Sequence, residues 1–149
     1  MIYHLCNIVY ERLTRNVVNN IVHPVAPRVL RTLFTANRSY QENRSEYKSV
    51  DRYMREFFQE ADVCVLSSHP ERGEITEMIN GLRMRCYNVA GVFWSNSYGT
   101  PAQNIATLSW DEVLRIENPE VHGDRAIAEQ LDRLAKYFTE MIIARSHAR

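Results

Sequence analysis

The chain has 149 residues, and its composition is 45% hydrophobic and 24% charged, so it is long and apolar enough for one globular domain with a substantial core. Its 18 basic and 18 acidic residues cancel to a formal net charge of zero, so bulk charge favours neither a nucleic acid polymer nor a membrane as partner. No apolar run has the length of a transmembrane span, and the start lacks the pattern of a signal peptide. We therefore expect a cytoplasmic protein with a single domain over residues 1–149.

The three cysteines are far apart, and no two of the five histidines have the spacing of metal ligands. We expect no disulfide framework, no metal site and no cofactor.

The first third of the chain predicts a strand over residues 1–9, a helix over 10–22 and a second strand over 28–34. Residues 35–49 are polar and lack apolar periodicity, which is typical of a lid or binding loop, or else of a loop that is merely mobile. Residues 28–55 carry seven basic and three acidic side chains. This segment is either a solvated basic face or a site that accepts a phosphate through arginine.

The centre of the chain predicts a strand, a loop, a helix and a second strand. An amphipathic helix over residues 50–61, with Ser49 as N-cap, leads into it. Then come an apolar run at Val63–Leu66, a polar loop at Ser67–Gly73, a helix with an apolar stripe, and an apolar run at Val89–Trp94. This order is typical of a βαβ unit with two parallel neighbouring strands, whose ligand lies at the start of the helix.

The last third predicts a polar loop over residues 95–104, a strand over 105–108, a helix that begins at a capping box from Ser109 to Glu112, and a final helix over 124–144. Strands that alternate with helices favour an α/β fold. We expect a three-layer sandwich of the Rossmann or flavodoxin type, with helices on both sides of a parallel sheet of about five strands.

The loop before the central helix is not a Walker A or dinucleotide motif, because it has a single glycine and lacks Gly-Lys-Ser/Thr. The informative spacing is Gly73 followed by Glu77, in which the glycine allows a ligand to approach the chain closely. If Ile75 centres the buried stripe, Glu77 lies about 200° around the helix and faces away from the core. Glu77 is therefore either a solvated charge or a carboxylate at a ligand crevice, and Glu74 is the alternative working carboxylate.

The segment Ala61-Asp-Val-Cys-Val-Leu, followed by Pro70-x-x-Gly73-x-x-x-Glu77, resembles the nucleoside 2-deoxyribosyltransferase family and its relatives, the deoxynucleoside 5'-monophosphate N-glycosidases. The helix before Ala61 and the later Tyr98-Gly-x-Pro101 and Asn104 match as well. The resemblance covers residues 50–104 well and the first third loosely.

The resemblance implies that Glu77 attacks the anomeric carbon of the sugar. It also implies a homodimer or larger homo-oligomer, in which Tyr98 and Asn104 reach an active site across a subunit interface. Two departures stand out. Met54 occupies the position of the family's aspartate, which helps protonate the leaving base, and Asp51 lies one turn earlier. Asn7 stands near the place of a glycine that usually ends the first strand.

We therefore expect an enzyme that cleaves or exchanges the N-glycosidic bond of a nucleoside or nucleoside 5'-monophosphate, as a transferase or a hydrolase. The alternatives are a binding module for a nucleotide-derived ligand and a domain whose sheet serves only assembly. The expected catalytic residues are Glu77 and Asp51, and the expected substrate-binding residues are Tyr3, Asn7, Arg38, Ser67, His69, Gly73, Tyr98 and Asn104.

Overall fold

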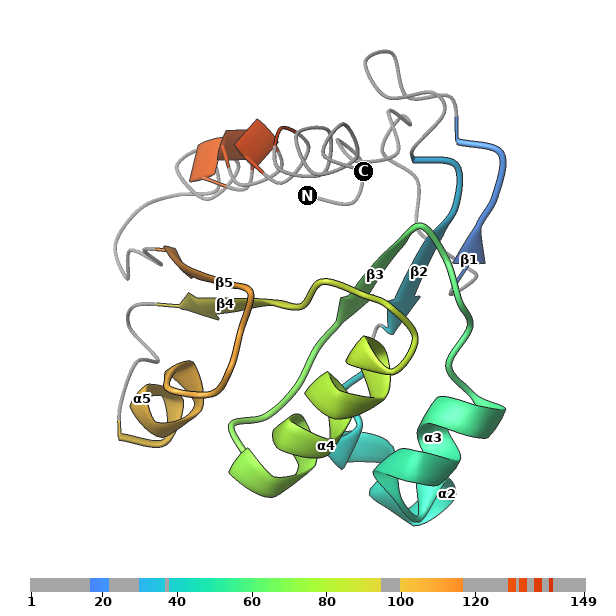
Figure 1. The fold of residues 1–149 in the computed structure, drawn as a ribbon, viewed down its shortest axis with the longest axis vertical. Helices are drawn as coiled ribbons and strands as arrows, with labels where there is room; N and C mark the ends of the chain where they lie inside the picture. Colours follow the sequence, from blue (N-terminus) through green and yellow to red (C-terminus); the bar gives the residue numbers. More distant parts are fainter. Residues whose placement is uncertain are drawn as a thin grey trace. The chain divides into compact units, whose positions relative to one another are not determined.

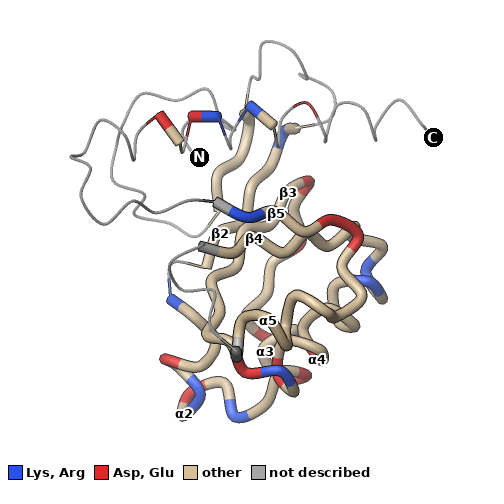
Figure 2. Tube along the Cα trace, turned by 90° about the vertical axis from the view of Figure 1, so that its left-hand side faces the viewer, with Lys and Arg blue, Asp and Glu red and all other residues tan. Residues whose placement is uncertain are grey.

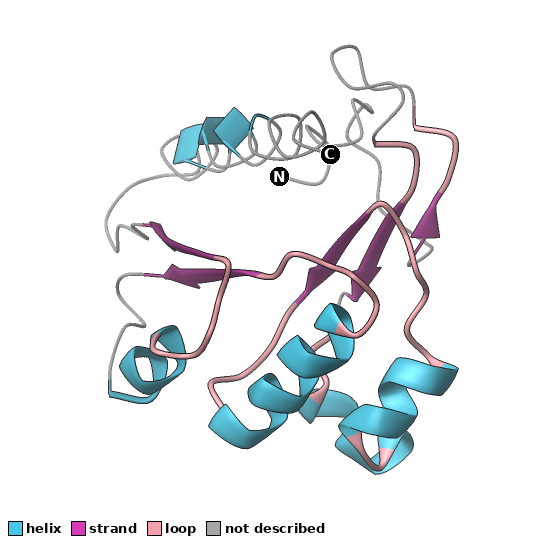
Figure 3. Cartoon of the chain, in the orientation of Figure 1, coloured by secondary structure: helices cyan, strands magenta, loops and turns pink. Residues whose placement is uncertain are grey.

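A computed structural model describes residues 17–21, 30–36, 38–94 and 100–116, and also 129–130, 132–133, 136–137 and 140. Its helices and short strands form a mixed α/β fold, as expected (Figure 1, Figure 3). The chain divides into two compact units. The first unit comprises Met1–Asn37, Gln59–Leu66 and Val121–Arg149, and the second unit comprises Arg38–Phe58 and Ser67–Glu120. Because each unit combines separate stretches of the chain, a single cut in the sequence would not separate them.

The first unit contains a three-stranded sheet in the order β1 (Val17–Val18), β2 (Leu33–Ala36), β3 (Val63–Leu66). β1 is antiparallel to β2, and β2 is parallel to β3. The prediction of a helix over residues 10–22 is therefore wrong at β1, where two β-branched valines pair with a buried strand. β2 confirms part of the strand expected over residues 28–34, and β3 matches its expected range.

Asp62 joins the starts of β2 and β3. Its Oδ2 accepts hydrogen bonds from the backbone nitrogens of Arg31 at 2.9 Å and Thr32 at 2.8 Å, and from Thr32 Oγ1 at 2.9 Å. The backbone nitrogen of Asp62 donates to Thr32 Oγ1 in return, at 2.9 Å. These hydrogen bonds lie at the start of the β2–β3 ladder and fix the register of the two strands. Asp62 is therefore a structural residue.

The second unit begins with short helical segments where a polar loop was expected. η1 (Gln41–Asn43) and α2 (Arg44–Tyr47) lie within residues 35–49, so the loop prediction is wrong there. The turn starts with a capping box: Glu42 Oε2 accepts from the backbone nitrogen of Ser39 at 2.9 Å, and Ser39 Oγ accepts from that of Glu42 at 3.3 Å. α3 (Val50–Glu56) follows, and its N-cap is Ser49, as predicted, with Oγ bonded to the backbone nitrogen of Arg52 at 3.1 Å.

α4 (Arg72–Arg83) is the longest of the helices with defined bounds, and it buries the predicted stripe of Ile75, Met78, Ile79 and Leu82. α4 packs against α3, with Met54 of α3 lying over Gly81. A Cβ built on Gly81 would lie 3.2 Å from Met54 Cγ. Met54 is therefore a buried contact between two helices.

The remaining strands of the second unit are β4 (Ala90–Trp94) and β5 (Glu112–Ile116), which pair in parallel from Ala90↔Glu112 to Trp94↔Ile116. α5 (Thr100–Ala106) connects them along the chain. The predictions of a strand over residues 105–108 and of a helix from Ser109 are therefore wrong, because residues 105–106 are helical and Glu112 begins a strand. The strand expected at Val89–Trp94 is confirmed.

The strand neighbours differ from those expected. The parallel ladders of the described residues join β2 to β3 and β4 to β5, in separate sheets of three and two strands. The expected parallel pair of Val63–Leu66 with Val89–Trp94 is thus not formed among the described strands. The described residues between 129 and 140 are helical, in agreement with the helix expected there.

Candidate functional site

The loop that leads into α4 is held by η1, within the second unit. Gln41 Nε2 donates to Ser68 Oγ at 3.1 Å, and Gln41 Oε1 accepts from the backbone nitrogen of His69 at 3.1 Å. His69 Nε2 also lies 3.9 Å from Glu42 Oε1. The loop Ser67–Glu71 therefore has a defined conformation, although its side chains are exposed.

Arg44 of α2 binds two carboxylates at the start of α4. Its Nη2 pairs with Glu71 Oε2 and lies 2.8 Å from Glu74 Oε1. These two carboxylates raise the pKa of Arg44 above its ordinary value, mainly through the hydrogen bond to Glu74 and then the one to Glu71. Arg44 is therefore a fixed positive charge that links α2 to α4.

One oxygen of Glu74 has no hydrogen-bond donor in the part of the chain that the structure describes. Glu74 is 22% exposed as a side chain, yet its Oε2 is buried and lacks a hydrogen-bond partner among the described residues. Buried acceptors without donors are rare in native proteins and cost about 1–3 kcal/mol. Glu74 thus offers a free acceptor beside a fixed arginine.

Tyr40 is a buried residue whose ionisation is influenced by Glu74, Arg44 and Glu77. It is 4% exposed, its ring stacks on Tyr47 with centroids 5.9 Å apart, and it meets Tyr53 edge-on at 6.0 Å. The pKa of Tyr40 is raised, first by burial, then by the charge of Glu74, with a smaller contribution from Glu77, while Arg44 acts in the opposite direction. Tyr40, Arg44, Glu71, Glu74 and Glu77 form what we call the carboxylate cluster.

Glu77 lies on the second turn of α4 and is exposed, so it faces away from the core, as its position on the helical wheel indicates. Glu77 follows Glu74 by three residues on α4, so the two side chains are neighbours on the helix surface. Gly73 is exposed, and a Cβ built on it would meet no atom within 4 Å. The helix surface beside Gly73 is thus open to a ligand.

Asn104 lies beside the start of α4 in its own chain. Arg72, the first residue of α4, donates from Nη1 to the carbonyl oxygen of Asn104 and to Thr107 Oγ1 at 3.3 Å. The side chain of Asn104 is exposed. The structure therefore brings Asn104 to the helix that carries Glu77 without a second subunit.

Arginines of the 28–55 segment form ion pairs with nearby carboxylates. Arg44 pairs within the cluster, Arg52 pairs with Glu56 at 2.7 Å, and Arg55 pairs with Asp51 at 3.0 Å. Figure 2 shows basic and acidic positions interleaved around α2, α3 and α4. Arg38 is exposed and makes no ion pair with a described residue, and the same holds for Arg31 and Lys48. Arg38 is therefore available to bind a phosphate.

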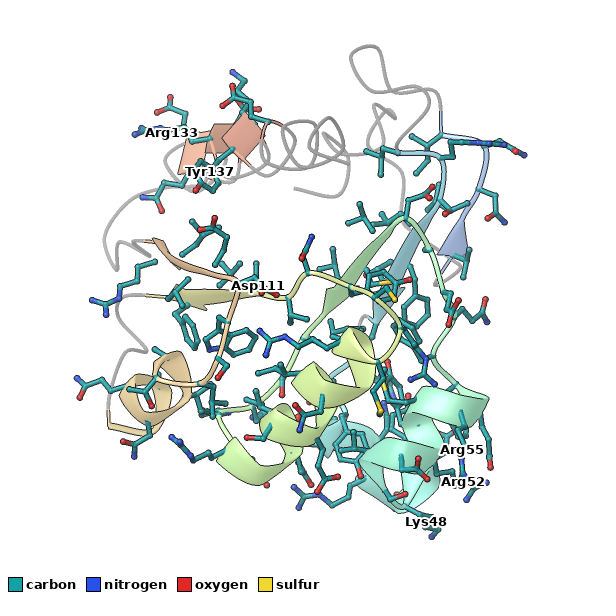
Figure 4. All side chains as sticks on the ribbon, in the orientation of Figure 1. Lys48, Arg52, Arg55, Asp111, Arg133 and Tyr137 are labelled. Atoms are coloured by element: carbon teal, nitrogen blue, oxygen red, sulfur yellow. The ribbon has the colours of Figure 1, made fainter. Side chains whose placement is uncertain are left out.

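Asp51 is not part of the carboxylate cluster. Its side chain is 73% exposed and its described partner is Arg55. Figure 4 shows Arg52 and Arg55 on the flank of α3 away from α4. Asp51 and Glu77 are thus not brought into contact, and Met54, where the family has an aspartate, is buried against Gly81. Tyr3, Asn7 and Tyr98 lie outside the described residues.

The sequence patterns did not identify Tyr40 and Gln41 as residues of the candidate site. The signal for them is the Ser39-x-x-Glu42 pattern, a capping-box signature that predicts a helical turn and so places both residues on an ordered element. Of the predicted residues, Ser67 and His69 lie in the loop that enters α4, Gly73 and Glu77 lie on its first two turns, and Asn104 is bonded through its backbone to Arg72.

Among the described residues, no group of three or more His, Cys, Asp or Glu side chains is placed to hold a metal ion. In the same part of the chain, no helix is long and apolar enough to cross a membrane. Comparison of the chain with protein-family models, curated proteins and solved structures found no match.

Proposed function

We propose that this protein cleaves or exchanges the N-glycosidic bond of a deoxynucleoside or a deoxynucleoside 5'-monophosphate, with Glu77 as the nucleophile. The observation that carries the proposal is the exposed Glu77 carboxylate on α4, next to the open surface at Gly73 and the ordered loop Ser67–Glu71. The resemblance of Pro70-x-x-Gly73-x-x-x-Glu77 to the deoxyribosyltransferases supports the same assignment.

The reaction has two steps. The Glu77 carboxylate forms a bond to the anomeric carbon, the C–N bond breaks, and the base leaves with its electron pair and takes up a proton. The glycosyl ester is then attacked by water, which gives a hydrolase, or by a second base, which gives a transferase. No cofactor is needed for either step.

Glu74 binds the sugar in this proposal. Arg44 fixes the position of its carboxylate, and its buried Oε2 has no hydrogen-bond donor among the described residues. A ligand hydroxyl at this place would remove the cost of an unsatisfied buried acceptor. Glu74 is also the alternative nucleophile.

Asp51 is the candidate from the sequence for protonating the leaving base, and in this structure it pairs with Arg55. Arg38 is the candidate for binding a 5'-phosphate, since it is exposed and adjacent to the Ser39–Glu42 capping box. Ser67 and His69 complete the expected substrate contacts from the loop.

The proposal extends to the whole protein. We propose a cytoplasmic homodimer or larger homo-oligomer that binds neither membranes nor nucleic acid polymers. Its fold would be a three-layer sandwich with a parallel sheet of about five strands, which the parallel ladders β2–β3 and β4–β5 support.

The test is incubation with a panel of deoxynucleosides and deoxynucleoside 5'-monophosphates, followed by chromatography for free base. We expect wild-type turnover and a loss of at least about a hundredfold in Glu77→Ala. Glu46→Ala, which removes an exposed glutamate of α2, is the matched control and should keep wild-type activity. Full turnover by Glu77→Ala with loss in Glu74→Ala would transfer the nucleophile to Glu74.

The second candidate function is binding of a nucleotide-derived ligand without turnover. The burial of Met54 at the position of the family's acidic residue favours it. Calorimetry with the same panel separates the two: binding without release of base from any member supports the binding module and contradicts the enzyme.

A further inference from the structure

The short helical segments η1 and α2 end in a strained turn. Lys48, the residue after α2, has φ 66° and ψ −46°, and the backbone nitrogen of Ser49 donates to the carbonyl oxygen of Tyr47 at 2.8 Å. This is a γ-turn with a positive φ, which is rare and strained for a residue that has a side chain. The exposed Lys48 side chain makes no ion pair with a described residue (Figure 4), so neighbouring contacts impose the turn.

Polar contacts hold these segments against the loop and the start of α4. Gln41 accepts a hydrogen bond from the backbone nitrogen of His69 at 3.1 Å. Arg44 pairs with Glu71 and Glu74, and the side chains of Arg44 and Glu71 are 48% and 50% exposed. Neither η1 nor α2 contains a buried residue. Water and salt therefore reach the contacts that hold both segments in place.

Aromatic rings anchor the two ends of this stretch. Tyr40, directly before η1, is buried. Tyr47, the last residue of α2, has its ring centroid 4.8 Å from those of Tyr53 and Phe57. We call residues 41–47 the strap, because they are anchored at the ends and held by exposed polar bonds in between.

The closed position of the strap has two unfavourable features. One is the positive φ of Lys48. The other is Glu74 Oε2, which is buried and has no hydrogen-bond partner among the described residues, while Arg44 lies 2.8 Å from the other oxygen of the same carboxylate. Lifting α2 away from α4 relaxes the turn and lets water reach this oxygen. Segments with few buried contacts open locally before the whole protein unfolds.

We propose that the strap is a lid that opens as one unit and uncovers Glu74 and the loop before α4. Under the proposed function, it controls the access of a substrate to Glu74. The opening itself belongs to the protein without ligand and does not require Glu77 to be a nucleophile. Its tests use no substrate, so failure of the enzyme proposal leaves their outcome unchanged.

Backbone hydrogen exchange of the ligand-free protein, measured by nuclear magnetic resonance, tests the opening. The amide of Asn43 is hydrogen-bonded within η1, and the amide of His69 is bonded to Gln41, so both report on the strap. Val89, a buried residue with a hydrogen-bonded amide, is the reference for the rest of the second unit. We expect equal protection factors for Asn43 and His69, both below that of Val89. Unequal factors for the first two, or protection as high as that of Val89, would overturn the proposal.

Lys48→Gly tests the strain in the turn. Glycine adopts a positive φ without penalty, so the closed strap gains stability, and the protection factors of Asn43 and His69 should rise about threefold or more. Lys48→Ala is the matched control, because it removes the amine and keeps a Cβ, and it should exchange like wild type. No rise in Lys48→Gly, or an equal rise in both variants, would contradict the role of the strained turn.

Arg44→Gln tests whether the strap moves as one unit. The change removes the ion pairs of α2 with α4, and the protection factor of His69, whose amide bonds to Gln41, should fall about threefold or more. Arg55→Gln removes an exposed pair with Asp51 on α3 and should leave it unchanged. If His69 kept its wild-type protection in Arg44→Gln, α2 and the loop would open separately, and the proposal would be wrong.

Discussion

Two glycines of the second unit have opposite surroundings. A Cβ on Gly73 would meet nothing within 4 Å, whereas a Cβ on Gly91 would lie 2.8 Å from Phe93 Cε2 and 2.9 Å from Trp110 Cδ2. Neither glycine has a positive φ. Space, and not backbone conformation, therefore decides the effect of adding a methyl group.

We predict that Gly73→Ala raises the free energy of unfolding by about 0.4–1 kcal/mol, because alanine restricts the unfolded chain and fits the helix. Gly91→Ala should lower it by about 1–3 kcal/mol, because Trp110 and Phe93 must move. Denaturant unfolding measures both.

If a ligand approaches the backbone at Gly73, Gly73→Ala should also weaken substrate binding, although it makes the protein more stable. An unchanged KM in Gly73→Ala would contradict this role of Gly73.

Tyr40 gives a prediction for alkaline pH. Its pKa is raised in the folded protein, mainly by burial and by Glu74, so the folded state holds the Tyr40 proton to a higher pH than the unfolded state does. Below the unfolded pKa of about 10 its contribution to stability is complete, and it is lost as pH rises through the raised folded value. Tyr40→Phe should therefore lose less stability than wild type over this window, measured by thermal unfolding at a series of pH values. Tyr137→Phe, at an exposed tyrosine, is the control, and its stability should depend on pH as that of wild type does. Identical stability-versus-pH curves for Tyr40→Phe and wild type would contradict the prediction.

At the scale of elements, the loop before α4 depends on η1. Gln41 makes hydrogen bonds to both Ser68 and His69, so its side chain is the main described link between η1 and this loop. The loop then enters α4 through Glu71, which Arg44 also holds. The short helical segments η1 and α2 thus hold the loop and the first turn of α4 in a defined conformation.

We predict that Gln41→Ala speeds hydrogen exchange of the His69 backbone amide, because that amide loses its 3.1 Å acceptor. Nuclear magnetic resonance measures this exchange residue by residue. Gln103→Ala, at an exposed position of α5, is the control and should leave the rate unchanged. An unaltered His69 rate in Gln41→Ala would show that the loop is ordered by other contacts.

The elements that the sequence predicts well are those with strong local patterns. β3 and β4 are uninterrupted apolar runs, and α4 has its apolar stripe at helical spacing, so each is specified by its own residues. β5 is different: Ser109 to Glu112 has a capping-box pattern, but parallel pairing with β4 makes Glu112 the first residue of a strand. A distant partner overrides local preference there.

In the candidate site, too, locally patterned residues could be predicted from the sequence and residues brought in by long-range contacts could not. The spacing of Gly73 and Glu77 is local and was found from the sequence. Tyr40, Gln41 and Arg44 reach the start of α4 from about thirty residues away, through contacts that no local pattern encodes. Asn104 was found by resemblance, and its place beside Arg72 in the same chain required the structure.

At the scale of the molecule, the residues of the carboxylate cluster and Asn104 all belong to the second unit. One compact unit therefore carries the proposed nucleophile, the arginine that fixes its neighbouring carboxylate, and the proposed substrate amide. The Asp62 contacts, by contrast, lie in the first unit and serve the β2–β3 ladder.

The most direct test of the central claim is detection of the covalent intermediate. A deoxynucleoside with fluorine at the sugar 2' position destabilises the second oxocarbenium-like transition state, so the glycosyl ester should accumulate. Peptide mass spectrometry after a brief incubation should then find the fluorinated sugar on the peptide with Glu77, and fragmentation should place it on that residue. Attachment to Glu74, or release of base with no adduct on either glutamate, would contradict the account.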